Sequence, residues 1–330
     1  METRIRERFN DHILQEAIAR YGIASQEVTL LDGFESFIYE FTRQGQPGIL
    51  RIGHSLRRTP QLIQAEVDWI NYLAQGGAGV AKALLSAHGN LVEAVDDGQG
   101  GQFLATAFTK ALGDTPRVAD RTPAFYERYG QLLGRIHALS RHYTPPHPDC
   151  QRAPWNAETN MEVVKFLPPS DEAIANHFRA LMAYLNALPI TSEGFGMIHQ
   201  DAHMSNLFVD EAGQITLFDF DDCCYGHYIY DLAMVIFYVI TNAPDMVATL
   251  RAFLPPFLEG YHRENQLDSA WMREIPHFLK LREIDLYAVI HRSMGPGPYE
   301  SRWVQNFMTG RRERLVANLP YVEFDFGALR

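Results

Sequence analysis

MIHQDAHMSNLFVDEAGQITLFDFDDCCYGHYIYD, the stretch from Met197 to Asp231, sets three polar side chains at spacings that suit one chemistry. Asn206 follows Asp201 by five positions, and Asp219 follows Asp201 by eighteen. A carboxylate with an open face accepts the proton of a hydroxyl group. An amide oxygen and a second carboxylate are hard ligands that suit Mg2+. The pattern therefore predicts a phosphoryl-transfer site, with Asp201 as proton acceptor and with Asn206 and Asp219 as metal ligands.

The segment between Asn206 and Asp219 has the pattern of a β-hairpin. Residues 207–209 and 215–218 are short apolar runs, and the turn-forming residues 210–213 lie between them. A hairpin of this length returns the chain to its starting point. The sequence thus predicts that Asn206 and Asp219 converge.

The run from His199 to Asn206, HQDAHMSN, resembles the catalytic loop of the kinase-like phosphotransferases. In the aminoglycoside and choline kinase branch, a second His follows the Asp by two positions, as His203 does. A short acidic motif such as Asp219-Phe220-Asp221 carries the metal ligand in that branch. Asp231-Leu232-Ala233 resembles its later helix start, whose Asp braces the catalytic loop. The protein-kinase branch requires a Gly directly after Phe220 and an Ala-Pro-Glu signature, and the sequence has neither.

The resemblance implies an α+β, two-lobed fold like that of the protein kinases. Residues 1–108 are expected to form a small nucleotide-binding lobe with an antiparallel sheet and one helix. Residues 109–330 are expected to form a larger, mainly helical lobe that carries the catalytic loop and the acceptor site. The implied reaction moves the γ-phosphoryl group of ATP, or of GTP, to a hydroxyl of a small molecule, with Mg2+. The alternatives are a protein serine/threonine kinase of the same fold and a catalytically weak nucleotide-binding protein.

The N-terminal part of the chain reads as strands with a loop between the first two. The strands are expected at 28–31, 37–41 and 49–52. The loop at 32–36 lies where the family covers the nucleotide phosphates, so Phe34 and Ser36 are candidate nucleotide contacts. With a single glycine, this loop also fits a plain hairpin.

The sequence offers a candidate cation to contact the phosphates and a candidate acid to hold that cation in place. Arg51 interrupts the apolar strand at 49–52, where the family carries a phosphate-contacting Lys or Arg. Glu66 lies at the edge of the apolar face of a helix predicted at 59–75. The resemblance implies an Arg51–Glu66 ion pair. Taken alone, Arg51 is more often a strand residue with its charged end in solvent.

The next segments lead from the sheet into the helical part of the chain. Residues 90–95 and 102–107 are expected to form a hairpin, and 108–114 are expected to form a hinge. A hinge of this kind offers backbone groups to an adenine edge, and Ala107 is the candidate for that contact. Helices are expected at 126–137, 231–241, 243–259, 269–293 and 299–316. Trp271, Tyr287 and Trp303 in these helices are either core residues or part of an acceptor pocket.

Several residues of the opening stretch have alternative readings. His199 and His203 are expected to brace the loop by hydrogen bonds. A hydrolase metal cluster is the alternative reading of His-x-Asp-x-His, but the other histidines lack a complementary paired spacing. Asp221 is either a second metal contact or a structural group. Cys223 and Cys224 are expected to be buried thiols.

Composition excludes some classes of protein. The net charge of −11 argues against nucleic acid as a partner, because phosphate binding needs a concentrated basic face. No apolar run reaches the roughly eighteen residues of a membrane span, and the N-terminus lacks an apolar signal region. With three cysteines in no pattern, we expect a cytoplasmic protein. The sequence does not predict an oligomeric state.

Charge also bears on the acceptor. From Leu181 to Leu250 the chain has acidic residues but no Lys or Arg. An acidic surplus near a catalytic loop creates a negative potential, part of which Mg2+ neutralises. This favours a cationic acceptor such as an amine-bearing or aminoglycoside-like alcohol. The alternative is that these acids serve turns and solvation.

Overall fold

The computed structural model describes residues 2–31, 33, 35–157, 162–295 and 297–329. It divides into two compact units. The first comprises the chain up to Asp114 together with Tyr143–Arg152 and Leu207–Asp221. The second comprises Thr115–His142, Ala153–Asn206 and the chain from Asp222 onward. The sequence predicts a single boundary after residue 108, whereas the chain of the structure passes between the units several times.

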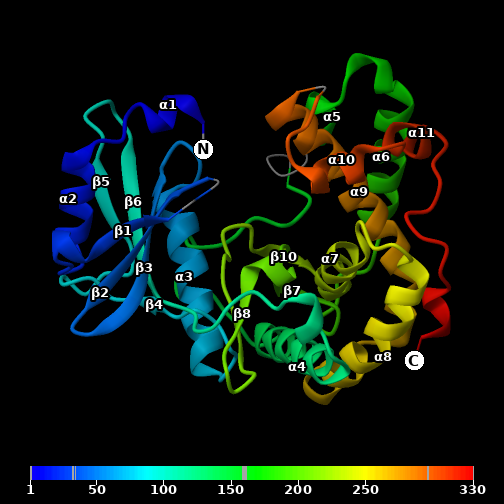
Figure 1. Ribbon diagram of the computed structural model, residues 1–330, viewed down its shortest axis with the longest axis horizontal. Helices are drawn as coiled ribbons and strands as arrows, with labels where there is room; N and C mark the ends of the chain where they lie inside the picture. Colours follow the sequence, from blue (N-terminus) through cyan, green and yellow to red (C-terminus); the bar gives the residue numbers. More distant parts are fainter. Residues whose placement is uncertain (1, 32, 34, 158–161, 296, 330) are drawn as a thin grey trace. The chain divides into compact units, whose positions relative to one another are not determined.

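The first unit contains a six-stranded antiparallel sheet, which agrees with the predicted α+β class (Figure 1). The strand order is β1-β2-β3-β6-β4, and β5 also pairs with β6. The strands are β1 (Val28–Leu31), β2 (Phe37–Arg43), β3 (Gln46–His54), β4 (Ala83–Leu84), β5 (Glu93–Asp96) and β6 (Gln102–Thr109). Helix α3 (Pro60–Gln75) follows β3, and Thr59 caps it by accepting a hydrogen bond from the backbone of Leu62.

Alternation along β3 sorts its side chains between the two faces of the sheet. Leu50 and Ile52 are buried in the core on one face. Arg51, between them, points to the opposite face and meets Glu66 of α3 there. Because side chains alternate between the two faces along a strand, Arg51 lies on the face opposite the apolar core.

Two helices precede the sheet, although the sequence predicts only one helix in this part of the chain. They are α1 (Thr3–Arg6) and α2 (Asp11–Arg20). Asn10 caps α2, and Ile13, Ala17 and Ile18 bury its apolar face in the same core as Leu50. Apolar residues at these spacings after an Asn are a recognised signal for the start of a helix, so α2 is predictable from the sequence.

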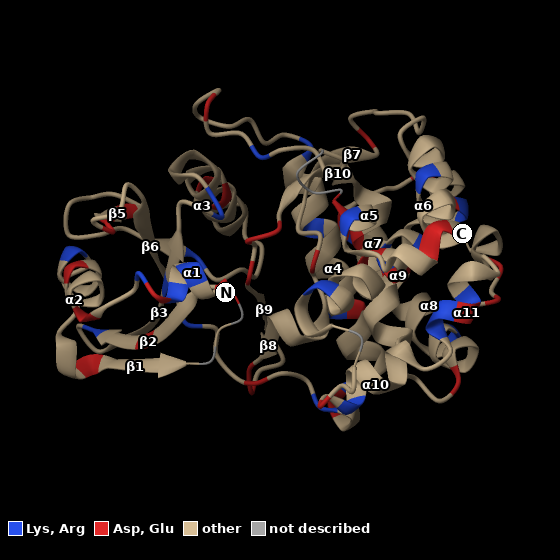
Figure 2. Ribbon diagram, turned by 90° about the horizontal axis from the view of Figure 1, so that it is seen from above, with Lys and Arg blue, Asp and Glu red and all other residues tan. Residues whose placement is uncertain are grey.

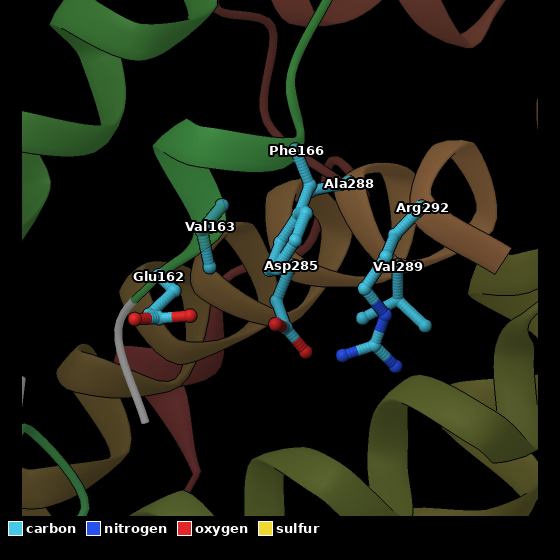
Figure 3. Close-up of a pocket in the computed structure, with 7 residues that line it drawn as sticks. All are labelled: Glu162, Val163, Phe166, Asp285, Ala288, Val289 and Arg292. Carbon is cyan, nitrogen blue, oxygen red and sulfur yellow. The ribbon is translucent and has the colours of Figure 1, made fainter. Parts of the chain in front are cut away.

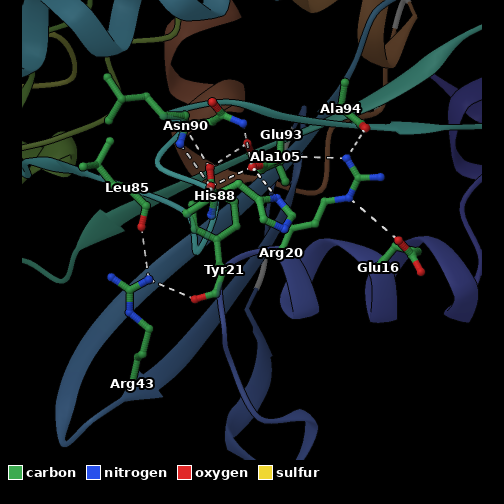
Figure 4. Close-up of polar contacts among 12 residues, drawn as sticks. Glu16, Arg20, Tyr21, Arg43, Leu85, His88, Asn90, Glu93, Ala94 and Ala105 are labelled. Carbon is green, nitrogen blue, oxygen red and sulfur yellow. Dashed lines mark hydrogen bonds and ion pairs between the residues drawn. The ribbon is translucent and has the colours of Figure 1, made fainter.

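The C-terminal end of α2 is tied to the sheet by polar contacts (Figure 4). The Arg20 guanidinium donates to the backbone oxygen of Ala94 at 2.7 Å. The Tyr21 hydroxyl donates to the backbone oxygen of Ala105 at 3.0 Å. Arg43 donates to the backbone oxygen of Tyr21 at 2.9 Å. These bonds satisfy backbone groups at the edge of the core and fix α2 against the strands.

The predicted catalytic hairpin forms as β8 (Leu207–Val209) and β9 (Ile215–Leu217). It is anchored within the first unit at both strands. The backbone of Leu217 bonds with Gly79 and Ala81, and that of Val209 bonds with Asp114. Gly113 has φ +83°, and a Cβ there would meet the backbone oxygen of Val209 at 1.9 Å. Only glycine allows this close approach of the two segments.

The second unit is mainly helical. Its helices are α4 (Pro123–Ser140), α5 (Val163–Phe166), α6 (Glu172–Leu185), α7 (Tyr228–Ile240), α8 (Met246–Glu264), α9 (Ile275–Met294), α10 (Arg302–Met308) and α11 (Arg311–Val316). A two-stranded antiparallel ladder joins β7 (Phe195–Ile198) to β10 (Cys224–His227). The helix predicted at 299–316 is two helices, because Gly310 has φ +64° and ends the first. The sequence did not predict the β7–β10 ladder, α5 or α6.

Helix α7 is buried on nearly all sides, from Tyr228 through Phe237. A helix that is apolar all round belongs to the interior of a unit rather than to its surface. The aromatic candidates for an acceptor pocket mostly serve packing. Tyr287 is buried and donates to Asp171 at 2.8 Å, and Trp303 stacks on Phe307. No helix in the described part of the chain is long and apolar enough to cross a bilayer.

Glycines allow α4 and α8 to pack closely. A Cβ on Gly130 would lie 1.8 Å from the backbone oxygen of Phe257, and a Cβ on Gly260 would lie 1.9 Å from that of Glu127. Both contacts are with backbone, which cannot move without shifting a helix. This crossing cannot be predicted from local sequence, because the two glycines lie 130 positions apart on different helices.

Replacing Gly260 with Ala tests this packing. Helix propensity alone would raise stability by about 1 kcal/mol. The backbone clash should outweigh that gain and lower the free energy of unfolding by at least about 2 kcal/mol. Urea unfolding measures the change. Arg128→Ala, on the exposed side of α4, is the control and should change stability by less than about 0.5 kcal/mol. A Gly260→Ala protein as stable as the wild type would contradict the close packing.

Candidate active site

The predicted catalytic loop follows β7 in the second unit and is held by one buried carboxylate. Asp231, in the first turn of α7, accepts hydrogen bonds from the backbone N–H groups of His199 at 2.8 Å and Gln200 at 2.6 Å. The Nε2 atom of His137 lies 3.1 Å from the same carboxylate. Gln200 has φ +68°, a left-handed conformation that a non-glycine residue keeps only where its surroundings fix it. The predicted bracing role of Asp231 is therefore present.

His137 is a neutral part of this brace. Burial lowers the pKa of His137, although the hydrogen bond to Asp231 opposes the shift. A neutral imidazole has one donor and one acceptor nitrogen. With Nε2 donating to Asp231, Nδ1 accepts from the Tyr261 hydroxyl at 2.8 Å.

Within the loop, one oxygen of Asp201 is hydrogen-bonded and the other is not. Asn206 Nδ2 lies 3.2 Å from Oδ2 of Asp201 and also donates to its backbone oxygen at 2.9 Å. His203 Nε2 lies 3.3 Å from the same Oδ2. His203 Nδ1 accepts from the backbone of Ser205, so the proton is on Nε2 and is donated to Asp201. Oδ1 of Asp201 is buried and has no hydrogen-bond partner among the described residues.

A guanidinium lies beside Oδ1 of Asp201, the oxygen that has no hydrogen bond. Arg282 Nη2 is 3.7 Å from Oδ1 of Asp201, too long for a hydrogen bond. Arg282 donates instead to Asp285 at 2.5 Å and to the Tyr238 hydroxyl at 2.5 Å. Burial would lower the pKa of Arg282, but Tyr238, Asp285 and Asp201 together raise it well above its ordinary value. Arg282 thus remains charged next to the candidate base.

These neighbours keep Asp201 ionised. Burial would raise its pKa, but the hydrogen bond from His203 and the charge of Arg282 more than offset burial and lower the pKa from 3.8 to about 2. A lowered carboxyl pKa contributes stability above about pH 4 that is lost as the pH falls towards 2. At neutral pH the carboxylate is available to orient a hydroxyl group and take its proton.

The predicted metal ligands have the chemistry that Mg2+ requires. Both N–H groups used by Asn206 point to Asp201, which leaves its amide oxygen for a cation. Asp219 lies in the first unit just after β9, with φ +63° and an exposed side chain. Leu207, next to Asn206, pairs with Leu217, two residues before Asp219. The described residues contain no cluster of three or more acidic, His or Cys side chains that could hold a metal, and the metal-binding role of Asn206 and Asp219 stays a prediction.

Asp221 is a structural group. Its carboxylate pairs with Arg57, and Arg51 and Arg58 lie 3.9 and 3.7 Å from it. Burial would raise the pKa of Asp221, but these arginines hold it well below its usual range. Phe220, beside it, is buried against Trp69 of α3. Three guanidinium groups around one carboxylate favour structural bonding over the second metal contact that the sequence left open.

The predicted Arg51–Glu66 ion pair is present in the first unit. Two parallel bonds of 2.7 and 2.8 Å join the guanidinium to the carboxylate, and Glu66 is completely buried. Burial would lower the pKa of Arg51, but Glu66 and Asp221 raise it above its ordinary value. The bidentate geometry fixes the plane of the guanidinium, which a lysine would not do.

Three further residues are predicted to contact the nucleotide: Phe34, Ser36 and Ala107. Phe34 lies outside the described residues. Ser36 directly precedes β2, and its neighbour Glu35 pairs with Arg57. Ala107 lies inside β6, paired with Leu50 of β3 and Leu84 of β4, and not in the hinge segment itself. Its predicted contact with an adenine edge stays a prediction.

Comparisons with known proteins agree with this geometry. The phosphotransferase enzyme family matches residues 27–275. The chain belongs to that family. It is 33% identical to the amicoumacin kinase of Bacillus subtilis over 97% of this chain and 96% of that protein. A solved structure of amicoumacin kinase hAmiN in complex with AMP-PNP, Ca2+ and Ami superposes with a TM-score of 0.94, at 32% identity over all of both chains.

More distant structures share the fold. A microcompartment-associated aminopropanol kinase has a TM-score of 0.72 at 20% identity, covering 94% of this chain and 98% of its own. As a member of the phosphotransferase enzyme family, the protein is a kinase that acts on a hydroxyl group of a small molecule. The resemblance to the aminoglycoside and choline kinase branch is confirmed at the level of family and fold.

Removing either partner of the Arg51–Glu66 pair should leave a buried charge uncompensated. Arg51→Ala and Glu66→Ala should each lower the free energy of unfolding by about 3–5 kcal/mol and weaken nucleotide use. The double variant should lose clearly less than the sum of the two, because the pair is lost only once.

Urea unfolding of the four proteins measures this coupling. The exposed Arg117–Asp120 pair is a matched control, for which coupling below about 0.5 kcal/mol is expected. Additive losses for Arg51 and Glu66 would show that the ion pair contributes nothing to the folded protein.

Proposed function

We propose that this kinase transfers the γ-phosphoryl group of ATP, with Mg2+, to a hydroxyl of an amine-bearing small molecule. The environment of Asp201 carries the proposal. One oxygen of the carboxylate is fixed by Asn206 and His203, and the other is buried with no hydrogen-bond partner among the described residues. A buried acceptor with nothing to accept from costs free energy, so it is well suited to a ligand hydroxyl.

The role of Asp201 would be confined to the acceptor molecule. Its Oδ1 would accept a hydrogen bond from the acceptor hydroxyl and take the proton as the oxygen bonds to the γ-phosphorus. The bond between that phosphorus and the bridging oxygen breaks, and ADP leaves. Because the transition state of phosphoryl transfer is loose, orientation of the hydroxyl contributes more than basicity. This suits a carboxylate whose pKa is about 2.

Other residues would serve the nucleotide. Asn206 and Asp219 would hold the Mg2+, which neutralises charge on the phosphates. Arg51, oriented by Glu66, would contact a phosphate, and the segment that includes Phe34 and Ser36 would cover it. The brace at Asp231 and the ordered bonds of Asp201 argue for an active enzyme and against a nucleotide-binding protein that has lost catalysis.

Amine-bearing acceptors are supported by relatives rather than by the acidic run of the sequence. Several acids of that run make structural contacts. Asp221 pairs with arginines, Asp231 accepts hydrogen bonds from the catalytic loop, and Asp245 caps α8. Acidic and basic residues are interspersed along the elements of both units (Figure 2). The relatives include amicoumacin kinase of Bacillus subtilis and, at the level of fold, an aminopropanol kinase. An antibiotic-type or amino-alcohol acceptor is therefore the proposed class.

A screen of purified protein tests the proposal. Amicoumacin, aminoglycosides, amino alcohols, amino acids, neutral sugars, sugar phosphates and hydroxycarboxylic acids are offered with ATP and Mg2+, and ADP release is followed. At least one amine-bearing alcohol should stimulate ADP release and appear as a phosphate ester. Stimulation only by sugar phosphates or carboxylic acids, with all amines inert at low salt, would contradict it.

Asp219→Ala tests the metal assignment by nucleotide binding. Mg2+ should tighten ATP binding to the wild type, and this tightening should disappear in the variant because one of two protein ligands is gone. Calorimetric titration with and without Mg2+ measures it, with Asp222→Ala as control at an exposed neighbouring acid. Equal metal dependence in wild type and Asp219→Ala would remove Asp219 from the site.

A further inference from the structure

A small pocket opens between α5 and α9 in the second unit. Its volume is about 110 Å3. Three charged residues, Glu162, Asp285 and Arg292, and the apolar side chains of Val163, Phe166 and Val289 line it. Figure 3 shows the two carboxylates and the guanidinium directed to the same side of the pocket, with Asp285 between the other two.

The charged groups divide the pocket into two ends. Glu162 and Asp285 form an acidic end. Arg292 forms the other end, where its guanidinium lies 5.3 Å from the centre of the Phe166 ring. Phe166 and Val289 supply apolar surface between the ends. This arrangement suits a short carbon skeleton that carries a cation at one end and an oxygen at the other.

Arg282 connects the acidic end to the candidate base. Its Nη1 donates to Asp285 at 2.5 Å, and its Nη2 lies 3.7 Å from Oδ1 of Asp201. One guanidinium therefore serves two carboxylates, one in the pocket and one in the catalytic loop. All three residues belong to the second unit.

The pocket and the base lie along one face of α9. Residues 282, 285, 289 and 292 recur at helical spacing, so their side chains share that face. From Arg282 to Asp285 the helix rises only about 4.5 Å. One guanidinium, that of Arg282, thus separates a molecule beside Asp285 from the carboxylate of Asp201.

Asp285 retains capacity for a cation. Arg282 also binds the Tyr238 hydroxyl, so its charge is shared among three partners. Glu162 is paired with Lys165, whose side chain is 69% exposed, and such surface pairs contribute at most about 1 kcal/mol. An ammonium group placed between Glu162 and Asp285 would meet two carboxylates that are only partly compensated.

The geometry points to this pocket as the acceptor subsite for a protonated amine. The amine lies between Glu162 and Asp285, the carbon skeleton lies on Phe166 and Val289, and a carbonyl or hydroxyl oxygen faces Arg292. The volume limits the occupant to one arm of an acceptor, because a cavity of about 150 Å3 holds a benzene-sized molecule. The inference rests on the proposed function and names the residues that select its substrate.

Paired acceptors isolate the charge of the amine. The probes are 1-amino-2-propanol, ethanolamine and kanamycin, each compared with its N-acetylated form, which keeps the hydroxyl groups and loses the cation. The quantity measured is the ratio of kcat/KM for the free amine to kcat/KM for the acetylated form. Calorimetric binding of the same pairs gives a second ratio that does not depend on turnover.

Glu162→Gln and Asp285→Asn should each lower both ratios at least tenfold. Arg292→Gln should weaken the binding of the free amine and of its acetylated form together. The ratios should be no lower than in the wild type, because the positive charge that is removed repels the amine in the wild type. Glu172→Gln, an exposed acid on α6, should leave the ratios unchanged. Glu162 is at the rim of the pocket, so its variant tests the idea even if Asp285→Asn disturbs Arg282.

Two results would overturn the subsite. Unchanged ratios in Glu162→Gln and Asp285→Asn would show that the amine binds elsewhere. Equal losses in those variants and in Arg292→Gln would show a general disturbance rather than recognition of charge. A wild-type protein that binds the amines preferentially but phosphorylates none would contradict the proposed function while supporting the pocket.

Discussion

The hydrogen bonds of the buried Asp231 carboxylate are the constraint on which the catalytic loop depends. A charge with no exposure to water is tolerated only when hydrogen bonds replace its solvation. Asp231 obtains them from two consecutive backbone N–H groups of the loop and from His137. The loop is thereby held in a conformation that includes the left-handed Gln200, and Asp201 is presented in one orientation. Loss of these hydrogen bonds would release the loop. It would also leave the charge of Asp231 buried without partners.

From that anchor the other features of the second unit follow in order. Asp201 is fixed through one oxygen by Asn206 and His203, and Arg282 stands near the other oxygen. Arg282 is in turn held by Asp285 and Tyr238, so the candidate base, the guanidinium and the proposed acceptor pocket form one chain of contacts. In the first unit the Arg51–Glu66 pair follows the same principle, because a buried acid fixes the orientation of the cation that we propose contacts a phosphate.

Local sequence signals predicted the parts of the site that neighbouring residues create. The spacing of Asp201, Asn206 and Asp219, the hairpin between the last two and the helix of Glu66 could be read from residue types and periodicity. Most contacts between distant residues could not, and the Arg51–Glu66 pair and the brace at Asp231 were predicted only through the family resemblance. Arg282 is 81 positions from Asp201, and Arg57, which pairs with Asp221, precedes it by 164 positions. The glycine-mediated crossing of α4 and α8 and the β7–β10 ladder were missed for the same reason. The acidic run at 181–250 does not by itself support the predicted cationic acceptor, because Asp221, Asp231 and Asp245 within it make structural contacts.

The central claim is that Asp201 accepts the acceptor's proton, and replacement by Asn tests it most directly. Asn keeps the shape of the side chain and removes its charge and basicity. ADP release with the best acceptor should fall at least about a hundredfold in Asp201→Asn, while calorimetric binding of the nucleotide stays within about twofold of the wild type. Asp210→Asn, in the β8–β9 turn, should leave turnover near normal and serves as the control. Turnover of Asp201→Asn close to that of the wild type would contradict the account.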